Sequence, residues 1–149
     1  MLDYLRRLYE HLFWADARVL TLPEEALGER GRTLLAHLLS SEAVWLARLS
    51  GRDSQAMQIW PTLCLAECAA LAEENRLGYA TYLEALPEGA LTEPIAYHNS
   101  TGQEFRTAPL DILTHVALHG SYHRGQIMQA VRDAGAEPVS TDYIVWERG

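Results

Sequence analysis

The stretch "PLDILTHVALHGSYHRGQI", residues 109–127, combines a helical pattern of apolar residues with three histidines at intervals of four. Pro109 is a residue favoured in the first turn of a helix, and the pattern continues to about Gly135. The buried face is expected to contain Leu113, Val116, Gly120, Ile127 and Val131. A helix of this length must bury such a face against other helices, so the segment predicts a helical bundle.

Three earlier segments show the same helical period. They run from about residue 2 to 23, from about 33 to 49, and from about 61 to 87. Four amphipathic helices predict an all-α four-helix bundle. The length of 149 residues and the apolar content of 48% fit one domain spanning residues 1–149.

The period changes between the third and fourth helices. In "PIAYHNSTGQEFRT", residues 94–107, two short runs flank a polar turn, which predicts a small β-hairpin with Gly102 in the turn. The C-terminal segment "PVSTDYIVWERG", residues 138–149, has too many apolar residues to remain free in solvent. We expect it to pack back on the bundle.

Charge and cysteine content narrow the class of protein. The formal net charge is −8, from 20 acidic residues against 12 basic ones, which argues against a nucleic-acid partner. No apolar run approaches the roughly 20 residues of a membrane span, and the N-terminus does not look like a secretion signal, so we expect a cytoplasmic protein without a membrane partner. Cys64 and Cys68, four residues apart, predict buried thiols rather than a disulfide.

The histidines of the fourth helix are candidate metal ligands. Successive helical residues are rotated by about 100°, so side chains four positions apart lie on nearly the same face and can bind one ion. His119 and His123 lie closest to the predicted apolar stripe, whereas His115 falls furthest toward solvent. We therefore prefer the pair His119 and His123, and leave His115 as a surface or supporting residue.

A third ligand must come from another segment. His37 is preferred because it lies at the edge of the apolar stripe of the second helix, with Ser41 one turn further on. His11 and His98 are weaker candidates by position. Ser41 and Gly120 are small, which would leave space beside the predicted site.

Other interpretations of these polar residues remain open. An HxxxH pair can consist of ordinary hydrogen-bonded histidines. Asp16 falls at the centre of the apolar stripe of the first helix, where it can pair with Arg124 for structural reasons or orient a ligand imidazole. Carboxylate-bridged dimetal sites and zincin-type sites are disfavoured, because the chain lacks Glu-x-x-His and HExxH motifs.

Four stretches of the chain form a recognisable set: "LLAHLLSSEAVWLARL", "YHNSTGQEF", "PLDILTHVALHGSYHRGQI" and "TDYIVWER". Together they resemble the DinB family of damage-inducible proteins, described as metal-dependent and unrelated to the DNA polymerase of the same name. The resemblance covers nearly the whole chain, and "HGSYHRGQ" within the third stretch is its most specific part.

The resemblance implies a four-helix bundle with long crossover connections and a divalent metal bound by three histidines. Carried over by position, these ligands are His37, His119 and His123. Where the family commonly has an asparagine in its first helix, this chain has Asp16, which would add negative charge near the metal. Zinc or nickel is favoured, and manganese or iron remains open.

The resemblance also implies a function. Relatives in the wider superfamily resemble S-transferases that use low-molecular-weight thiols, so the leading hypothesis is thiol transfer onto an electrophile in a stress response. Metal-dependent hydrolysis and non-catalytic binding of a metal or small ligand are the alternatives. Members of the family are often homodimers, and outward-facing Trp14, Leu118 and Tyr122 are candidates for the interface.

Overall fold

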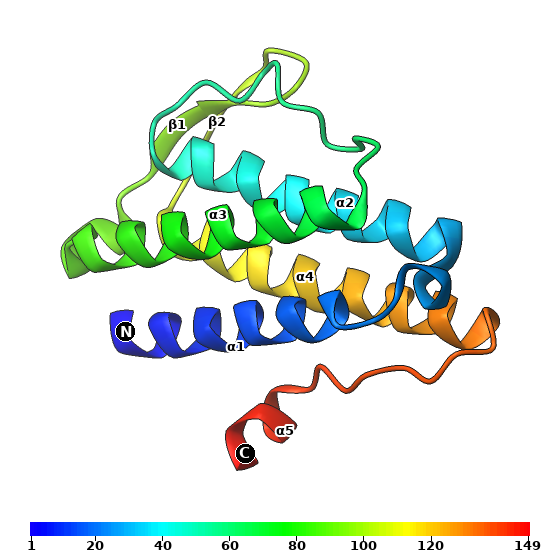
Figure 1. Ribbon diagram of the computed structural model, residues 1–149. Coiled ribbons are helices and arrows are strands. Elements are labelled where there is room, and N and C mark those ends of the chain that lie inside the picture. Colours follow the sequence, from blue (N-terminus) through cyan, green and yellow to red (C-terminus); the bar gives the residue numbers. More distant parts are fainter.

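The computed structural model describes all residues 1–149 and confirms the predicted all-α bundle. Its four long helices lie side by side (Figure 1). They are α1 (Leu2–Leu20), α2 (Glu24–Leu49), α3 (Leu65–Ala85) and α4 (Pro109–Asp133). No helix is long and apolar enough to span a membrane.

The order of the helices requires one long crossover. α2 and α3 run in the same direction, so residues 50–64 return along the length of the bundle before α3 begins (Figure 1). This segment lies over α2, where its backbone contacts the side chain of His37. The crossover therefore belongs to the wall around the candidate site.

Two predicted helix starts are wrong. α2 begins at Glu24 rather than near residue 33, with a kink at Gly28, whose φ of 62° and ψ of −178° interrupt the helix. Glycine tolerates a positive φ, so it can join a short first turn to the main helix. α3 begins at Leu65 rather than near residue 61, because Cys64 caps it through a reciprocal pair of hydrogen bonds with Glu67.

The hairpin and the fourth helix agree with prediction. β1 (Ile95–His98) pairs antiparallel with β2 (Glu104–Thr107), and Gly102 in the turn has a φ of 80°. A short 3-10 helix, η1 (Glu88–Thr92), connects α3 to this hairpin. α4 ends at Asp133, with Gly135 just beyond it at a φ of 76°.

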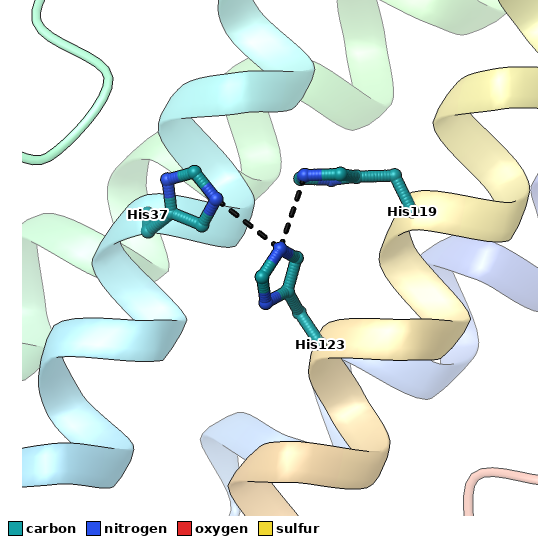
Figure 2. Close-up of side chains that lie close together, drawn as sticks. All are labelled: His37, His119 and His123. Carbon is teal, nitrogen blue, oxygen red and sulfur yellow. Dashed lines mark hydrogen bonds between the residues drawn. The ribbon is translucent and has the colours of Figure 1, made fainter.

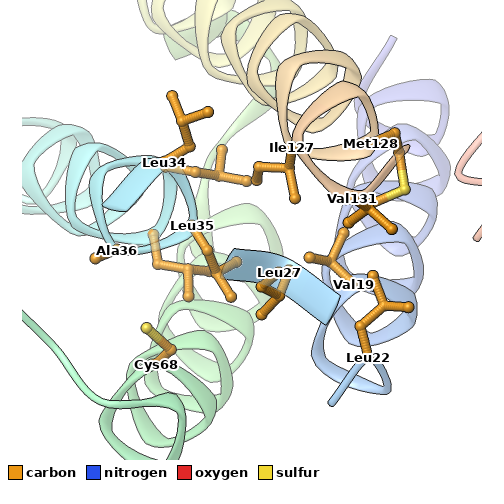
Figure 3. Packing of buried hydrophobic residues seen from close by; sticks show 12 residues of the cluster. Val19, Leu22, Leu27, Leu34, Leu35, Ala36, Cys68, Ile127, Met128 and Val131 are labelled. Carbon is orange, nitrogen blue, oxygen red and sulfur yellow. The ribbon is translucent and has the colours of Figure 1, made fainter. Parts of the chain in front are cut away.

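The core consists of two clusters of buried apolar side chains. The first joins residues of α1, α2 and α4 with Cys68 of α3 (Figure 3). The second lies toward the other end of α1 and includes Tyr9, Tyr79 and Leu113. Truncating a fully buried leucine such as Leu35 to alanine is expected to cost about 2–5 kcal/mol of stability.

The C-terminal segment packs on α1, as predicted. It ends in α5 (Tyr143–Arg148), and the rings of Tyr143 and Trp146 lie 5.1 and 5.8 Å from that of His11. The backbone carbonyl of Thr141 lies 3.0 Å from Nε2 of His11. His11 is therefore a buried packing residue of this end of the fold.

Two expectations about single residues are wrong. Cys68 is buried, but Cys64 is exposed at the start of α3, although both are free thiols as predicted. Trp14 is half-buried beside a groove between α1 and α3 rather than facing outward. Leu118 and Tyr122 do face outward, with 66% and 65% of their surfaces exposed.

Candidate metal centre

The fold brings together the three histidines singled out from the sequence. His37 projects from α2, and His119 and His123 project from α4, toward a common point (Figure 2). The Nε2 atom of His123 lies 3.2 Å from Nε2 of His37 and 3.1 Å from Nε2 of His119. All three candidate ligand atoms lie within 4.8 Å of one another.

The outer nitrogens of two of these rings have acceptors. Nδ1 of His37 lies 2.9 Å from the backbone carbonyl of Ile59, and Nδ1 of His123 lies 2.8 Å from Oε1 of Gln126. Each Nδ1–H therefore donates outward, which fixes the tautomer and leaves a lone pair on each Nε2. Ser41 lies near His37 as predicted, with its Oγ 3.4 Å from Nδ1.

This arrangement fits a metal ion. Two lone pairs that face each other at 3.2 Å repel unless a cation lies between them. Nitrogen atoms about 2.0–2.1 Å from a tetrahedral zinc are separated by about 3.3 Å, close to both short separations. The donor set is nitrogen alone, which suits zinc, nickel, copper or iron better than it suits magnesium or calcium.

The protonation of the cluster also favours a cation. Burial lowers the pKa of His37, and the neighbouring charge of His123 lowers it further. Burial and the neighbouring imidazoles together lower the pKa of His119 to about 4. Both rings are thus neutral at neutral pH and can offer a lone pair without first losing a proton.

Exposed aromatic rings surround the cluster. Trp60, in the crossover, stacks on His37 with 3.6 Å between ring centroids and 6° between planes, yet 58% of its surface is exposed. The ring of Tyr122 lies 5.2 Å from that of His123. His115 is exposed, with its ring 5.6 Å from that of His119 and 5.2 Å from that of Trp45, so it borders the cluster without joining it.

Asp16 and Arg124 lie in the core and bind each other. Nη1 of Arg124 donates to Oδ1 of Asp16 at 2.8 Å, and each side chain is 2–3% exposed. This is the ion pair considered from the sequence, and the polar contacts of Asp16 go to Arg124 and Glu42 rather than to a histidine of the cluster. Removing either partner would leave an uncompensated charge in the core beside the cluster.

Glu42 completes this buried network and was missed in the sequence. Its Oε2 accepts a hydrogen bond from Asn75 at 3.2 Å, and its carboxyl group lies close to that of Asp16. Burial raises the pKa of both carboxyl groups, and the charge of Asp16 raises that of Glu42 further, while Arg124 counteracts the effect at Asp16. Oε1 of Glu42 and Oδ2 of Asp16 have no hydrogen-bond partner, and a proton shared between the two carboxyl groups would supply one.

The space beside Gly120 is not a pocket, contrary to expectation. A Cβ atom at this position would lie 2.9 Å from Nη1 of Arg124, so the guanidinium already fills the space. A side chain at this position would push the guanidinium of Arg124 away from its place beside Asp16. The weaker ligand candidates are also placed elsewhere, His11 under α5 and His98 exposed in the hairpin beside Glu104.

Comparison with known proteins identifies the family of this chain. The sequence model of the DinB family matches residues 1–149. Protein DinB of Bacillus subtilis (strain 168) is 28% identical over 160 residues, which cover 96% of this chain and 93% of that protein. Since the family match extends over the whole chain, the protein belongs to the DinB family.

Proposed function

We propose that His37, His119 and His123 bind a divalent metal ion and that the protein uses it in a metal-dependent reaction. The observation that supports this most strongly is the convergence of the Nε2 atoms of His37 and His123, whose protons are held on the opposite ring nitrogens. Zinc or nickel suits three imidazoles best, with iron or manganese as further candidates.

We propose thiol transfer onto an electrophile as the reaction. A divalent ion with three protein ligands supplies Lewis-acid chemistry, lowering the pKa of a thiol or water molecule that shares its coordination sphere. In the transfer, the thiol sulfur forms a bond to carbon, the leaving group departs with the electron pair of the broken bond, and the thiol proton passes to solvent.

The chain's own residues would position the reactants. Ile59 and Gln126 hold two imidazoles in place through their outer nitrogens, so the ligands need little rearrangement. Trp60 and Tyr122 present exposed aromatic surface beside the cluster, suited to holding the apolar part of an electrophile. The crossover, which carries Trp60, therefore contributes both orientation and binding surface.

The first experiment measures metal content. Protein purified without chelator or nickel resin is analysed for zinc, nickel, manganese and iron, beside His119→Ala and the control His98→Ala, which alters an exposed histidine of the hairpin. We expect about one ion per chain in the wild type and in the control, and loss of the ion in His119→Ala. A wild type that takes up none of these metals would refute the proposed site.

The second experiment measures activity. The loaded protein is incubated with cysteine or glutathione and chlorodinitrobenzene, and the thioether is followed by absorbance as chloride is released. We expect turnover that needs both metal and thiol and is lost in His123→Ala. Metal-dependent hydrolysis of a nitrophenyl ester without thiol would favour the hydrolase instead, and metal binding without either activity would favour a non-catalytic role.

We further propose that two copies associate through the face formed by α1 and α4. A groove of about 460 Å³ lies there, lined mostly by apolar side chains, with exposed Leu118 on its margin. Light scattering at micromolar concentration should give the mass of a dimer, and Leu118→Glu should give that of a monomer. A monomeric wild type would contradict the proposal.

A further inference from the structure

Two arginines are buried in this protein, and only one has an acidic partner. Arg124 pairs with Asp16, as described above. Arg48, near the end of α2, is 92% buried (8% exposed) and forms no ion pair. A buried charge without a counter-charge is costly, so it needs an explanation.

Neighbouring residues accept from only one of the nitrogens of the Arg48 guanidinium. Its Nε donates to Oγ of Ser54 at 3.1 Å. Its guanidinium carbon lies 4.5 Å from the ring centroid of Trp45 and 5.3 Å from that of Tyr97, so aromatic rings contact the group. The terminal nitrogens Nη1 and Nη2 have no protein acceptor, and neither is sealed from solvent.

Arg48 lines a pocket of about 260 Å³ between the end of α2 and the hairpin. Its wall is polar and includes Arg48, Arg52, Ser54, Gln55 and His98. The one carboxylate in the wall, Asp53, accepts a hydrogen bond from the backbone N–H of Gln55. In a chain of net charge −8, two guanidinium groups against one carboxylate make this wall locally positive.

We propose that this pocket binds an oxyanion, the carboxylate or phosphate group of a small ligand, through the terminal nitrogens of Arg48. Aromatic contacts and Ser54 hold the guanidinium in place, so the four N–H donors of its two terminal nitrogens are oriented before a ligand arrives. Burial lowers the pKa of Arg48, but an arginine remains charged under all ordinary conditions. Arg52 would add a second, exposed positive charge.

The pocket is separate from the histidine cluster. His37 and Arg48 are eleven residues apart on α2, which corresponds to about 16 Å along the helix axis. The oxyanion site therefore needs no metal and can be tested in His119→Ala as well as in the wild type. Failure of one proposal leaves the other measurable.

The test is titration with sodium phosphate and with sodium succinate at constant ionic strength. Backbone amide shifts in NMR spectra and the thermal midpoint are recorded for the wild type, Arg48→Gln and Arg132→Gln, a control that removes an exposed charge on α4. We expect saturable shifts confined to residues 48–55 and 96–98, affinity at least about tenfold lower in Arg48→Gln, and no change in the control.

Saturable shifts with only one of the two anions identify the group, phosphate or carboxylate, that the pocket accepts. Saturable shifts with both identify a general oxyanion site. If Arg48→Gln does not fold, the location of the shifts in the wild type decides, together with Arg48→Lys, which keeps the charge but loses the planar pair of donors. The absence of saturable shifts with both anions, or unchanged affinity in a folded Arg48→Gln, overturns the proposal.

Discussion

Replacing Glu42 by glutamine should be tolerated, although the side chain is 1% exposed and lies in the core. Burial and the charge of Asp16 raise the pKa of this carboxyl group, which favours a protonated Glu42, and glutamine would preserve the charge and shape of that form. Its amide oxygen can accept from Asn75, and its amide nitrogen can donate to Asp16 as a carboxylic acid would. At about pH 5, where little of the stability contributed by the proton has been lost, we expect the free energy of unfolding of Glu42→Gln to lie within about 1 kcal/mol of the wild type.

Replacing Asp16 by asparagine should have the opposite outcome. This change leaves the guanidinium of Arg124 buried without a negative partner, and such losses cost about 3–5 kcal/mol. For a chain of this size, the melting temperature should fall by roughly 10–15 °C. Two substitutions that each convert one buried carboxyl group to an amide should therefore differ by several kcal/mol.

The pH dependence tests the same assignment. Because the pKa of Glu42 is raised in the folded state above its usual value of 4.5, the stability that its proton contributes is fully present below that value. The contribution is lost as pH rises through the folded pKa. In urea denaturation from about pH 5 to about pH 9, the wild type should lose stability relative to Glu42→Gln as pH rises.

Two results would refute the proton on Glu42. One is a loss of more than about 3 kcal/mol in Glu42→Gln at neutral pH, which would mean that an ionised Glu42 is needed. The other is a stability difference between Glu42→Gln and the wild type that does not change with pH.

Three further predictions concern the surroundings of the cluster. Gln126→Ala should weaken metal binding by about 10–100-fold in competition with a chelator while leaving the melting temperature of the metal-free protein nearly unchanged, because it removes only an orienting acceptor. Metal uptake should change the fluorescence of Trp60, and this change should be absent in Trp60→Phe, since the indole stacks on a ligand imidazole. Gly120→Ala should cost about 1–3 kcal/mol in denaturation by displacing Arg124, whereas Gly125→Ala, which meets no atom within 4 Å, should be neutral or stabilising.

The period of the apolar residues correctly predicted features that are set within a single helix, such as which side chains share a face. His119 and His123 lie on one face of α4, and His37 lies at the margin of α2, so helical geometry alone selected the cluster. The first turn of α2 was not predicted, because a positive φ at Gly28 breaks the helical period there. The pairing of Asp16 with Arg124 was among the alternatives because both residues fall on apolar stripes.

Features that depend on the crossover were beyond sequence reasoning. Ile59 contributes a backbone carbonyl, which has no signature in the side-chain pattern. Trp60 reaches His37 only because residues 50–64 return over α2. Gln126 had a local signal, since it lies three residues after His123 on the same helix, and this spacing could have identified it.

The cluster unites residues that are far apart along the chain, and this determines when it can form. His37 and His123 are separated by 86 positions, and closing a flexible loop of that length costs about 4 kcal/mol in chain entropy. Burial of the apolar side chains of the core offsets that cost during folding, and none of the three histidines belongs to this core. During synthesis, His119 and His123 emerge with α4, after α1, α2 and α3, so the cluster is completed only when the last helix of the bundle packs.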